Sequence, residues 1–316
     1  MEYKQTRQGY ADALIELARE IPNLVVLDTD VAKASKTCDF AAVYPDRFFN
    51  CGVQEQNMIS VAAGLAIEGF LPFATTFAAF AAYRAADQVR NSIAYPKLNV
   101  KIGATHGGTS TGGDGASHQA NEDIAVMRAF PNMTVVVPGD YEEARLATKA
   151  AAAYKGPVYL RFGRDTYPVV PQIHGSFEIG KAKLLRDGWD LTIITTGIMV
   201  SEGLIAAGEL AKDGISARVI HMPTIKPLDE AIVVKAADET GGIVTAEEHS
   251  ILGGLGEAVS ALVCEHKPVP VRRIGVRDVF GESGQAQELL TKFGLRASNI
   301  AEAARALSSR NVESTR

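Results

Sequence analysis

A glycine-rich segment of this sequence holds two of its six histidines, His106 and His118. Five glycines and Asp114 lie between them. A histidine can donate or accept a proton near neutral pH, and a glycine-rich backbone can bring its N–H groups close to an anion. The segment could therefore move protons on a negatively charged substrate, but by itself it is equally well interpreted as a solvated loop.

A carboxylate and three aromatic residues accompany apolar helical stretches. Glu55 begins an apolar helix, where the helix dipole favours an acidic residue without any catalytic role. Phe77, Phe80 and Tyr83 recur at intervals of three residues, which places them on one face of a predicted helix. Such a stripe normally belongs to a hydrophobic core, so neither feature alone indicates a ligand site.

Short β-rich segments alternate with helical ones along the chain. The predicted strands span residues 23–28, 99–105, 133–138, 157–161, 191–195, 217–220, 242–245 and 269–274. The predicted helices span residues 57–68, 77–94, 141–154 and 299–307, and further helices begin at Ser201, Asp229 and Gly254. This alternation predicts an α/β fold of mostly parallel sheets with helices on both faces. Ligands bind such sheets at the carboxyl ends of strands, where the loops after Asp28 and Thr105 begin.

The length of 316 residues favours two domains. A stretch of mixed periodicity that contains Pro171 and Gly180 interrupts the alternation of strands and helices. We therefore predict a first domain over 1–168, a linker over 169–188 and a second, smaller α/β domain over 189–316.

Composition excludes several classes of protein. A net charge of −5 argues against a surface for nucleic acid or for an anionic membrane. Gly69 and Pro72 interrupt the weakly charged stretch 56–83, so we predict a buried helix, strand and helix there instead of a transmembrane span. No secretory signal is visible, and the three cysteines form no CxxC pair. We expect no disulfide framework, no zinc site and a cytoplasmic location.

Four motifs, in order, resemble the transketolase family of thiamine-diphosphate enzymes. They are Gly52-Val-Gln-Glu-Gln-Asn-Met58, Thr76-Phe-Ala-Ala-Phe-Ala-Ala-Tyr83, Thr105-His106 and Asp114-Gly-Ala-Ser-His-Gln119. Their order and spacing match the family's pyrimidine-binding domain over essentially the whole first domain. Two motifs of the second domain are similar to the family's C-terminal domain, namely Thr245-Ala-Glu-Glu-His249 and Phe280-Gly-Glu-Ser-Gly284.

The resemblance implies a cofactor site on the first domain. Glu55 would be the catalytic carboxylate that hydrogen-bonds the pyrimidine ring of thiamine diphosphate and favours its imino form. Phe77, Phe80 and Tyr83 would form the wall on which this ring stacks, with Phe80 as the main contact.

The resemblance also implies a substrate site. His106 would face the hydroxyls or phosphate of a sugar, and Asp114 would hydrogen-bond a substrate hydroxyl. His118 would move protons on the substrate oxygens, so both histidines are catalytic candidates. Arg164 and, more loosely, Ser35 match positions that hold the substrate phosphate. The alternative for Arg164 is a surface arginine after an edge strand.

One part of the family's machinery is not found in this sequence. Single-chain transketolases have a preceding domain that binds the diphosphate through a divalent metal, using a Gly-Asp-Gly motif and a later asparagine. Gly113-Asp114-Gly115 is rejected as that motif, because residues 141–145 hold no asparagine. We expect this chain to supply no metal ligands and a partner subunit to hold Mg²⁺ and the diphosphate. Gly253-Gly-Leu-Gly256 is interpreted as a tight turn, not as a dinucleotide fingerprint.

The function predicted from this resemblance is that of the C-terminal subunit of a split transketolase. It would act with an N-terminal partner subunit, in an assembly with two copies of each chain. The reaction would transfer a two-carbon ketol unit from a ketose phosphate to an aldose phosphate. Residues 107–113 depart from the family's usual residues, so a branched donor such as apulose 4-phosphate, or a sulfonated ketose, is an alternative.

Three other assignments are open. Deoxyxylulose-phosphate synthase shares the Asp-Gly-x-x-His-Gln loop but usually lacks a histidine at the place of His106. The β-subunit of 2-oxoacid dehydrogenases has a different loop around the histidine. A non-catalytic subunit that keeps the fold is disfavoured by the presence of Glu55, His106, Asp114 and His118.

Overall fold

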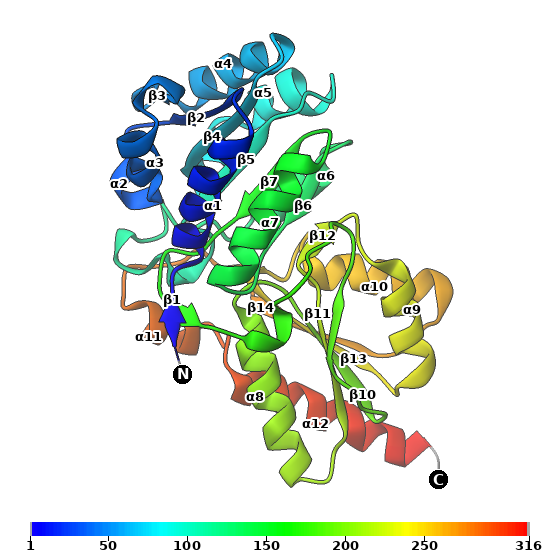
Figure 1. The fold of residues 1–316 in the computed structure, drawn as a ribbon. Helices are drawn as coiled ribbons and strands as arrows, with labels where there is room; N and C mark the ends of the chain where they lie inside the picture. Colours follow the sequence, from blue (N-terminus) through cyan, green and yellow to red (C-terminus); the bar gives the residue numbers. More distant parts are fainter. Residues whose placement is uncertain (1, 315–316) are drawn as a thin grey trace.

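The computed structural model describes residues 2–314, which form two large sheets with helices packed against them and a two-stranded sheet of β1 and β8 (Figure 1). Within these residues the first sheet has seven strands, in the order β12-β6-β7-β5-β4-β2-β3. In that order the strands span Thr224–Lys226, Thr134–Val136, Val158–Arg161, Lys101–Thr105, Leu71–Phe77, Leu24–Asp28 and Phe48–Asn50. Neighbouring strands are parallel, except that β12 runs antiparallel to β6.

Helices cover both faces of the first sheet. Tyr10 and Leu14 of α1 (Thr6–Glu20) pack with α7 (Tyr141–Ala153) against one face. Met58 and Ile59 of α4 (Glu55–Ile67) pack against the other. Strands covered on both sides need apolar residues at successive positions, and every residue of β2 and of β4 is indeed buried. The smaller elements around this sheet are β1 (Tyr3–Lys4), α2 (Ala32–Ser35), α3 (Thr37–Val43), α5 (Ala86–Gln88), α6 (Asp123–Ala129) and β8 (Tyr167–Pro168).

The second sheet has the order β14-β13-β10-β11-β9, and only its edge strand β9 is antiparallel. In that order its strands span Val271–Val276, Ile243–Ser250, Leu191–Thr195, Ala217–His221 and Lys183–Arg186. Its helices are α8 (Met199–Lys212), α9 (Glu230–Glu239), α10 (Leu255–His266), α11 (Ala286–Lys292) and α12 (Ala297–Ser314). Helices α8 and α12 cover one face, and α9 and α10 cover the other. The predicted fold class, two mostly parallel sheets with helices on both faces, is confirmed.

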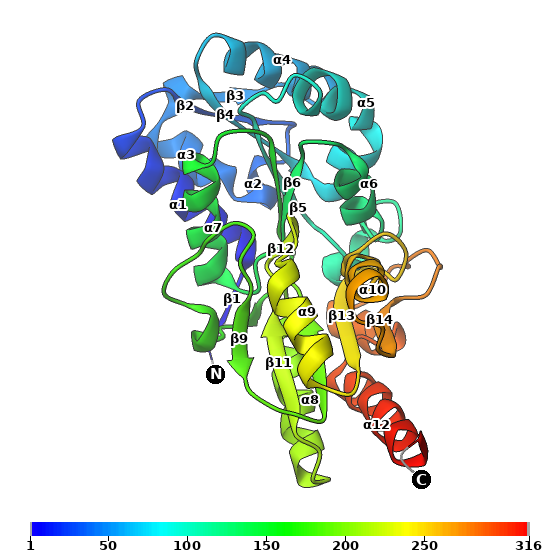
Figure 2. The same cartoon turned by 90° about the vertical axis from the view of Figure 1, so that its right-hand side faces the viewer.

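One strand of the second predicted domain completes the sheet of the first. Thr224–Lys226 follows β11 of the second sheet but pairs with β6 of the first. Figure 2 shows β12 between the strands of the first sheet and helix α9. The predicted linker 169–188 includes β9, which is hydrogen-bonded to β11 and so belongs to the second sheet. Lys183–Arg186 is therefore an edge strand of the second sheet inside the predicted linker, and the domain limits at 168 and 189 stay predictions.

The prediction of a single regular helix over 77–94 is wrong. Strand β4 continues to Phe77, and the following chain consists of two π-helical turns, Phe80–Arg84 and Val89–Ala94, around the short α5. A π-turn holds one more residue than an α-turn, so a spacing of three no longer keeps side chains on one face. In the stretch 56–83 the predicted order of helix, strand and helix is present, with a π-helical turn as the last element and with Tyr83 exposed instead of buried. No helix within residues 2–314 has the length and apolarity needed to cross a membrane.

Candidate functional site

Four aromatic or imidazole rings meet at the carboxyl edge of the first sheet. Phe77 ends β4, and His106 directly follows β5. Their rings stack at 3.8 Å between centroids, and Phe77 also stacks on Phe80 at 5.6 Å. The ring of His118, from the far end of the glycine-rich loop, meets Phe80 edge-on at 5.1 Å. The fold therefore brings together both histidines and two of the three aromatic residues singled out in the sequence.

Glu55 lies beside this ring cluster, at the first residue of α4. Its carboxylate is 1% exposed and accepts a hydrogen bond from Nη1 of Arg84 at 2.8 Å. The guanidinium of Arg84 also covers the Phe80 ring, with Cζ 4.1 Å from the centroid. Glu55 and Phe80 therefore hold one flat, nitrogen-bearing group between them, the carboxylate at its edge and the ring at its face. Sequence reasoning missed Arg84, although its place in the chain four residues after Phe80 was visible.

His106 is held as a neutral imidazole. Arg7 Nη1 lies 3.4 Å from Nε2, and an arginine can only donate, so Nε2 is the acceptor and Nδ1 carries the proton. Nδ1 then donates to the Thr105 hydroxyl at 2.9 Å. Burial, assisted by the charges of Arg7 and Arg164, lowers the pKa of His106 to about 3. This histidine can donate or accept hydrogen bonds but does not carry charge near neutral pH.

Two arginines stand next to the histidine. Arg164 donates to the carbonyl of Thr111 at 2.6 Å and to the Asp114 carboxylate at 3.1 Å. Arg7, from α1, is buried and donates to the carbonyl of Ala34 at 2.6 Å. Burial lowers the pKa of Arg7, and the charge of Arg164 lowers it further. Sequence reasoning missed Arg7, because no local pattern connects residue 7 with a loop that begins at residue 106.

Two other residues singled out in the sequence are engaged elsewhere. The Ser35 hydroxyl is fully buried and donates to Asp28 Oδ2 at 3.1 Å, beside the Thr37 hydroxyl. Tyr83 donates its hydroxyl to Glu122 at 2.5 Å and shares no ring contact with Phe77 or Phe80 among the described residues. The expectation of one helix face for all three aromatic residues is therefore wrong, because Phe77 belongs to a strand. Within residues 2–314, no three His, Cys, Asp or Glu side chains gather closely enough to hold a metal ion.

Comparison with known families and proteins covers nearly the whole chain. Residues 2–170 match the family model of the transketolase pyrimidine-binding domain, and residues 180–300 match that of the transketolase C-terminal domain. A putative transketolase C-terminal section from Methanocaldococcus jannaschii is 50% identical, over 95% of each chain. A 6-deoxy-6-sulfo-D-fructose transketolase subunit from Clostridium sp. is 44% identical, over 98% of this chain and 96% of its own length. One of the subunits of an apulose-4-phosphate transketolase from Phocaeicola vulgatus is 41% identical, over 94% of this chain and 96% of its own length.

Solved structures agree with these relatives. A split-gene transketolase, described as an inactive β4 tetramer, is 50% identical and has a TM-score of 0.89, over 96% of this chain and 98% of its own. The transketolase of Pichia stipitis in complex with sedoheptulose-7-phosphate is 25% identical, with a TM-score of 0.84. It covers 98% of this chain, which corresponds to 46% of its own longer chain.

Proposed function

Because this chain belongs to the transketolase family, we propose that it is the C-terminal subunit of a split transketolase that moves a two-carbon ketol unit between sugar phosphates. The observation that carries this proposal is the meeting of Glu55, Phe80, His106 and His118 at one sheet edge. This would be the pyrimidine-side half of such a site, brought together from the start of α4, the π-helical turn Phe80–Arg84 and the glycine-rich loop after β5.

The residues fit the aminopyrimidine of thiamine diphosphate. Arg84 already bonds Glu55 through nitrogen while it lies on the Phe80 ring, so the pair accepts a flat group with N–H donors at its edge. When bound, thiamine diphosphate supplies the nucleophilic carbon that breaks and remakes the bond beside the ketose carbonyl. In this proposal Glu55 holds the proton at the pyrimidine nitrogen, and Phe80 orients the ring.

The substrate would lie beside the histidines and arginines. A neutral His106, whose Nδ1–H is taken by Thr105, offers Nε2 as an uncharged acceptor, which suits a sugar hydroxyl that replaces Arg7 there. Arg7 and Arg164 provide the positive charge that a phosphate or sulfonate requires. His118 meets the rings edge-on and is exposed enough to exchange protons with a ligand, so we assign it proton transfer on the substrate oxygens. Asp114, paired with Arg164, would accept a hydrogen bond from a substrate hydroxyl.

A partner subunit would complete the site with Mg²⁺ and the diphosphate. The Pichia stipitis chain that matches this one is about twice as long, and this chain aligns with 46% of it. The two matched domain models are the pyrimidine-binding and C-terminal ones. These observations support a partner that carries the remaining domain, in an assembly with two copies of each chain.

A second donor, a sulfonated ketose, is favoured by one observation. The relative that is 44% identical over almost the entire chain acts, by its name, on 6-deoxy-6-sulfo-D-fructose. A sulfonate is an anion of similar shape to phosphate, so Arg7 and Arg164 could hold either group. The departure at 107–113 lies in the loop that borders this anion site.

The test is reconstitution. This chain, a diphosphate-binding partner subunit, thiamine diphosphate and Mg²⁺ are mixed, and ketol transfer to an aldose phosphate is followed by mass spectrometry with fructose 6-phosphate, apulose 4-phosphate and sulfofructose as donors. We expect turnover only with both chains present, because each would hold a different part of the cofactor. Full turnover by this chain alone would contradict the split arrangement. No turnover with any ketose would contradict the transketolase assignment.

A further inference from the structure

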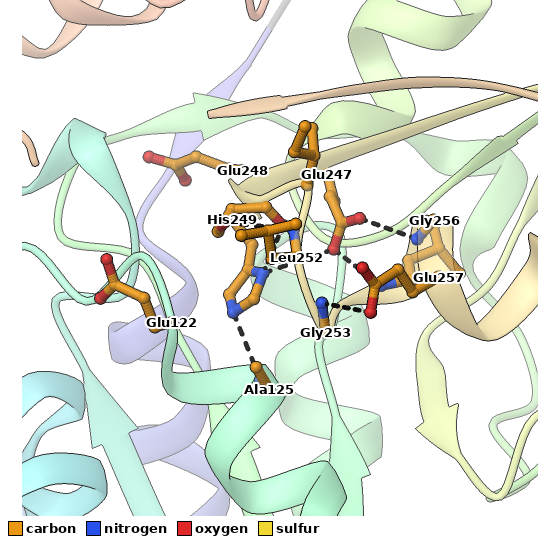
Figure 3. Close-up of polar contacts among 12 residues, drawn as sticks. Glu122, Ala125, Glu247, Glu248, His249, Leu252, Gly253, Gly256 and Glu257 are labelled. Carbon is orange, nitrogen blue, oxygen red and sulfur yellow. Dashed lines mark hydrogen bonds and ion pairs between the residues drawn. The ribbon is translucent and has the colours of Figure 1, made fainter. Parts of the chain in front are cut away.

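The buried motif Glu247-Glu248-His249 lies at the end of β13, against the first domain. Glu247 accepts hydrogen bonds from the backbone N–H groups of Leu255 and Gly256 at 2.7 and 2.8 Å, where α10 begins. His249 Nε2 accepts from the N–H of Ala125 at 3.3 Å (Figure 3). Successive strand residues alternate between faces, and Figure 3 shows Glu248 directed away from these two side chains.

Glu248 instead holds the glycine-rich loop of the first domain. Its Oε1 accepts from the N–H of Ser110 at 2.6 Å and from the Thr109 hydroxyl at 3.3 Å. Its side chain is 3% exposed, so water does not compete for these bonds. A buried carboxylate that accepts a backbone N–H forms a strong hydrogen bond. Removal of the Glu248 carboxylate would leave the Ser110 N–H and the Thr109 hydroxyl without this acceptor.

The loop backbone passes close to this carboxylate in a conformation that favours glycine. Gly108 has φ +84°, and a Cβ there would lie 2.4 Å from the carboxyl carbon of Glu248. Where the two ends of the loop come together, Arg161 donates to the carbonyls of Ala120 and Glu248 at 2.9 and 3.0 Å. The N–H of Gly108 closes the loop on the Ala120 carbonyl at 2.9 Å.

The residues held by Glu248 connect directly to the substrate side. Thr111, next to Ser110, donates its hydroxyl to the carbonyl of His106 at 2.7 Å. The carbonyl of Thr111 accepts a hydrogen bond from Arg164, which also donates to the Asp114 carboxylate. We propose that Glu248 is a positioning residue, contributed by the second domain, that fixes the loop carrying His106, Asp114 and His118 in the geometry the substrate requires. The kinetic part of this inference rests on the proposed transketolase function, and the structural part does not.

The first test is hydrogen–deuterium exchange on the isolated chain. In Glu248→Ala we expect peptides covering 107–120 to exchange about tenfold faster than in the wild type, because the Ser110 N–H loses its acceptor. Glu248→Gln keeps one acceptor oxygen and should restore most of the protection. Glu247→Ala is the matched control, since it removes a buried carboxylate from the same strand whose hydrogen bonds go to the start of α10 and whose Oε2 lies 3.7 Å from Nδ1 of His249, with no bond to the glycine-rich loop among the described residues. Its melting temperature should fall while the loop stays protected.

The second test is kinetic and uses the reconstituted two-chain enzyme. We expect Glu248→Ala to raise KM for the sugar phosphate about tenfold and to leave cofactor affinity within about twofold of wild type. If the alanine variant does not fold, Glu248→Asp replaces it, with the same expected result. Glu248→Gln should return KM most of the way. Unchanged loop exchange and unchanged KM in the Glu248 variants, or equal effects from Glu247→Ala, would overturn the positioning role. A wild-type assembly without any turnover would instead count against the proposed function, while the exchange result would still decide the role of Glu248.

Discussion

The guanidinium of Arg84 lies 2.8 Å from the Glu55 carboxylate and covers the ring of Phe80 at 4.1 Å. Its side chain is 46% exposed, whereas that of Glu55 is 1% exposed. A half-exposed cation thus neutralises a buried carboxylate at the place where the proposed function puts the aminopyrimidine. Binding of the cofactor would require Arg84 to leave, and the side chain has open solvent to leave into.

Arg84→Ala tests this relationship. Removing the guanidinium leaves Glu55 buried without its partner, so we expect the chain without cofactor to lose about 1–2 kcal/mol of stability, a modest figure because Arg84 is half exposed. Thiamine diphosphate should bind the reconstituted variant about three- to tenfold more tightly, since it no longer displaces a competing group. Urea unfolding and calorimetric titration measure the two effects. Arg90→Ala is the control, because the Arg90 side chain is exposed and bonds only to Asn91 among the described residues. Weaker cofactor binding in Arg84→Ala would mean that Arg84 helps to hold the cofactor.

Glu55→Gln should leave the fold intact and lower turnover by about 10²–10⁴, the usual range for the loss of a proton-transfer group. The amide keeps the size of the side chain but cannot take part in proton transfer at the pyrimidine. Hydrogen–deuterium exchange at the reactive carbon of bound cofactor, followed by NMR, should slow in parallel. Glu68→Gln, just beyond the exposed end of the same helix, serves as control. Wild-type exchange in Glu55→Gln would refute the role given to Glu55.

Arg7→Ala and Arg164→Ala should each raise KM for a phosphorylated ketose by about tenfold or more, and much less for the matching unphosphorylated sugar. The reason is that a charge-assisted hydrogen bond to the anion exists only when the anion is present. Steady-state kinetics of the two-chain enzyme with both sugars measures the difference. Arg19→Ala, at the exposed end of α1, is the control. Equal increases for the two sugars would show that neither arginine recognises the anionic group.

The low pKa of His106 predicts a dependence of stability on pH. A histidine with an ordinary pKa of 6.5 in the unfolded chain and about 3 in the fold stabilises the folded state fully above pH 6.5. That contribution is lost as the pH falls from 6.5 towards 3, because the unfolded chain takes up the proton first. Between pH 7.5 and 5 the loss from His106 is about 2 kcal/mol. Urea titrations give the free energy of unfolding at each pH. From pH 7.5 to 5 this free energy should fall by about 2 kcal/mol less in His106→Gln than in the wild type. An identical pH dependence in variant and wild type would show that His106 is not held neutral.

Several features of this protein follow from the sequence alone. The alternation of short strands and helices sets the fold class, because period and turn chemistry are local properties. The rule that strand ends carry ligand-binding loops in parallel sheets pointed to the sheet edge, and the motifs that resemble the transketolase family singled out Glu55, Phe80, His106 and His118 as site residues. These predictions needed only residues close to one another in the chain.

Only the tertiary structure decided which distant residues meet. Arg7 reaches His106 across 99 positions, and Glu248 reaches Ser110 across 138, through sheet order and domain packing that no local pattern encodes. The strand Thr224–Lys226 joins the sheet of the other domain for the same reason. Tyr83 turned away from Phe77 because a strand end and a π-turn replaced the regular helix that their spacing implied. Hydrogen bonding of the backbone to neighbouring strands overrode helical periodicity there, since buried strand β4 gains partners on both sides.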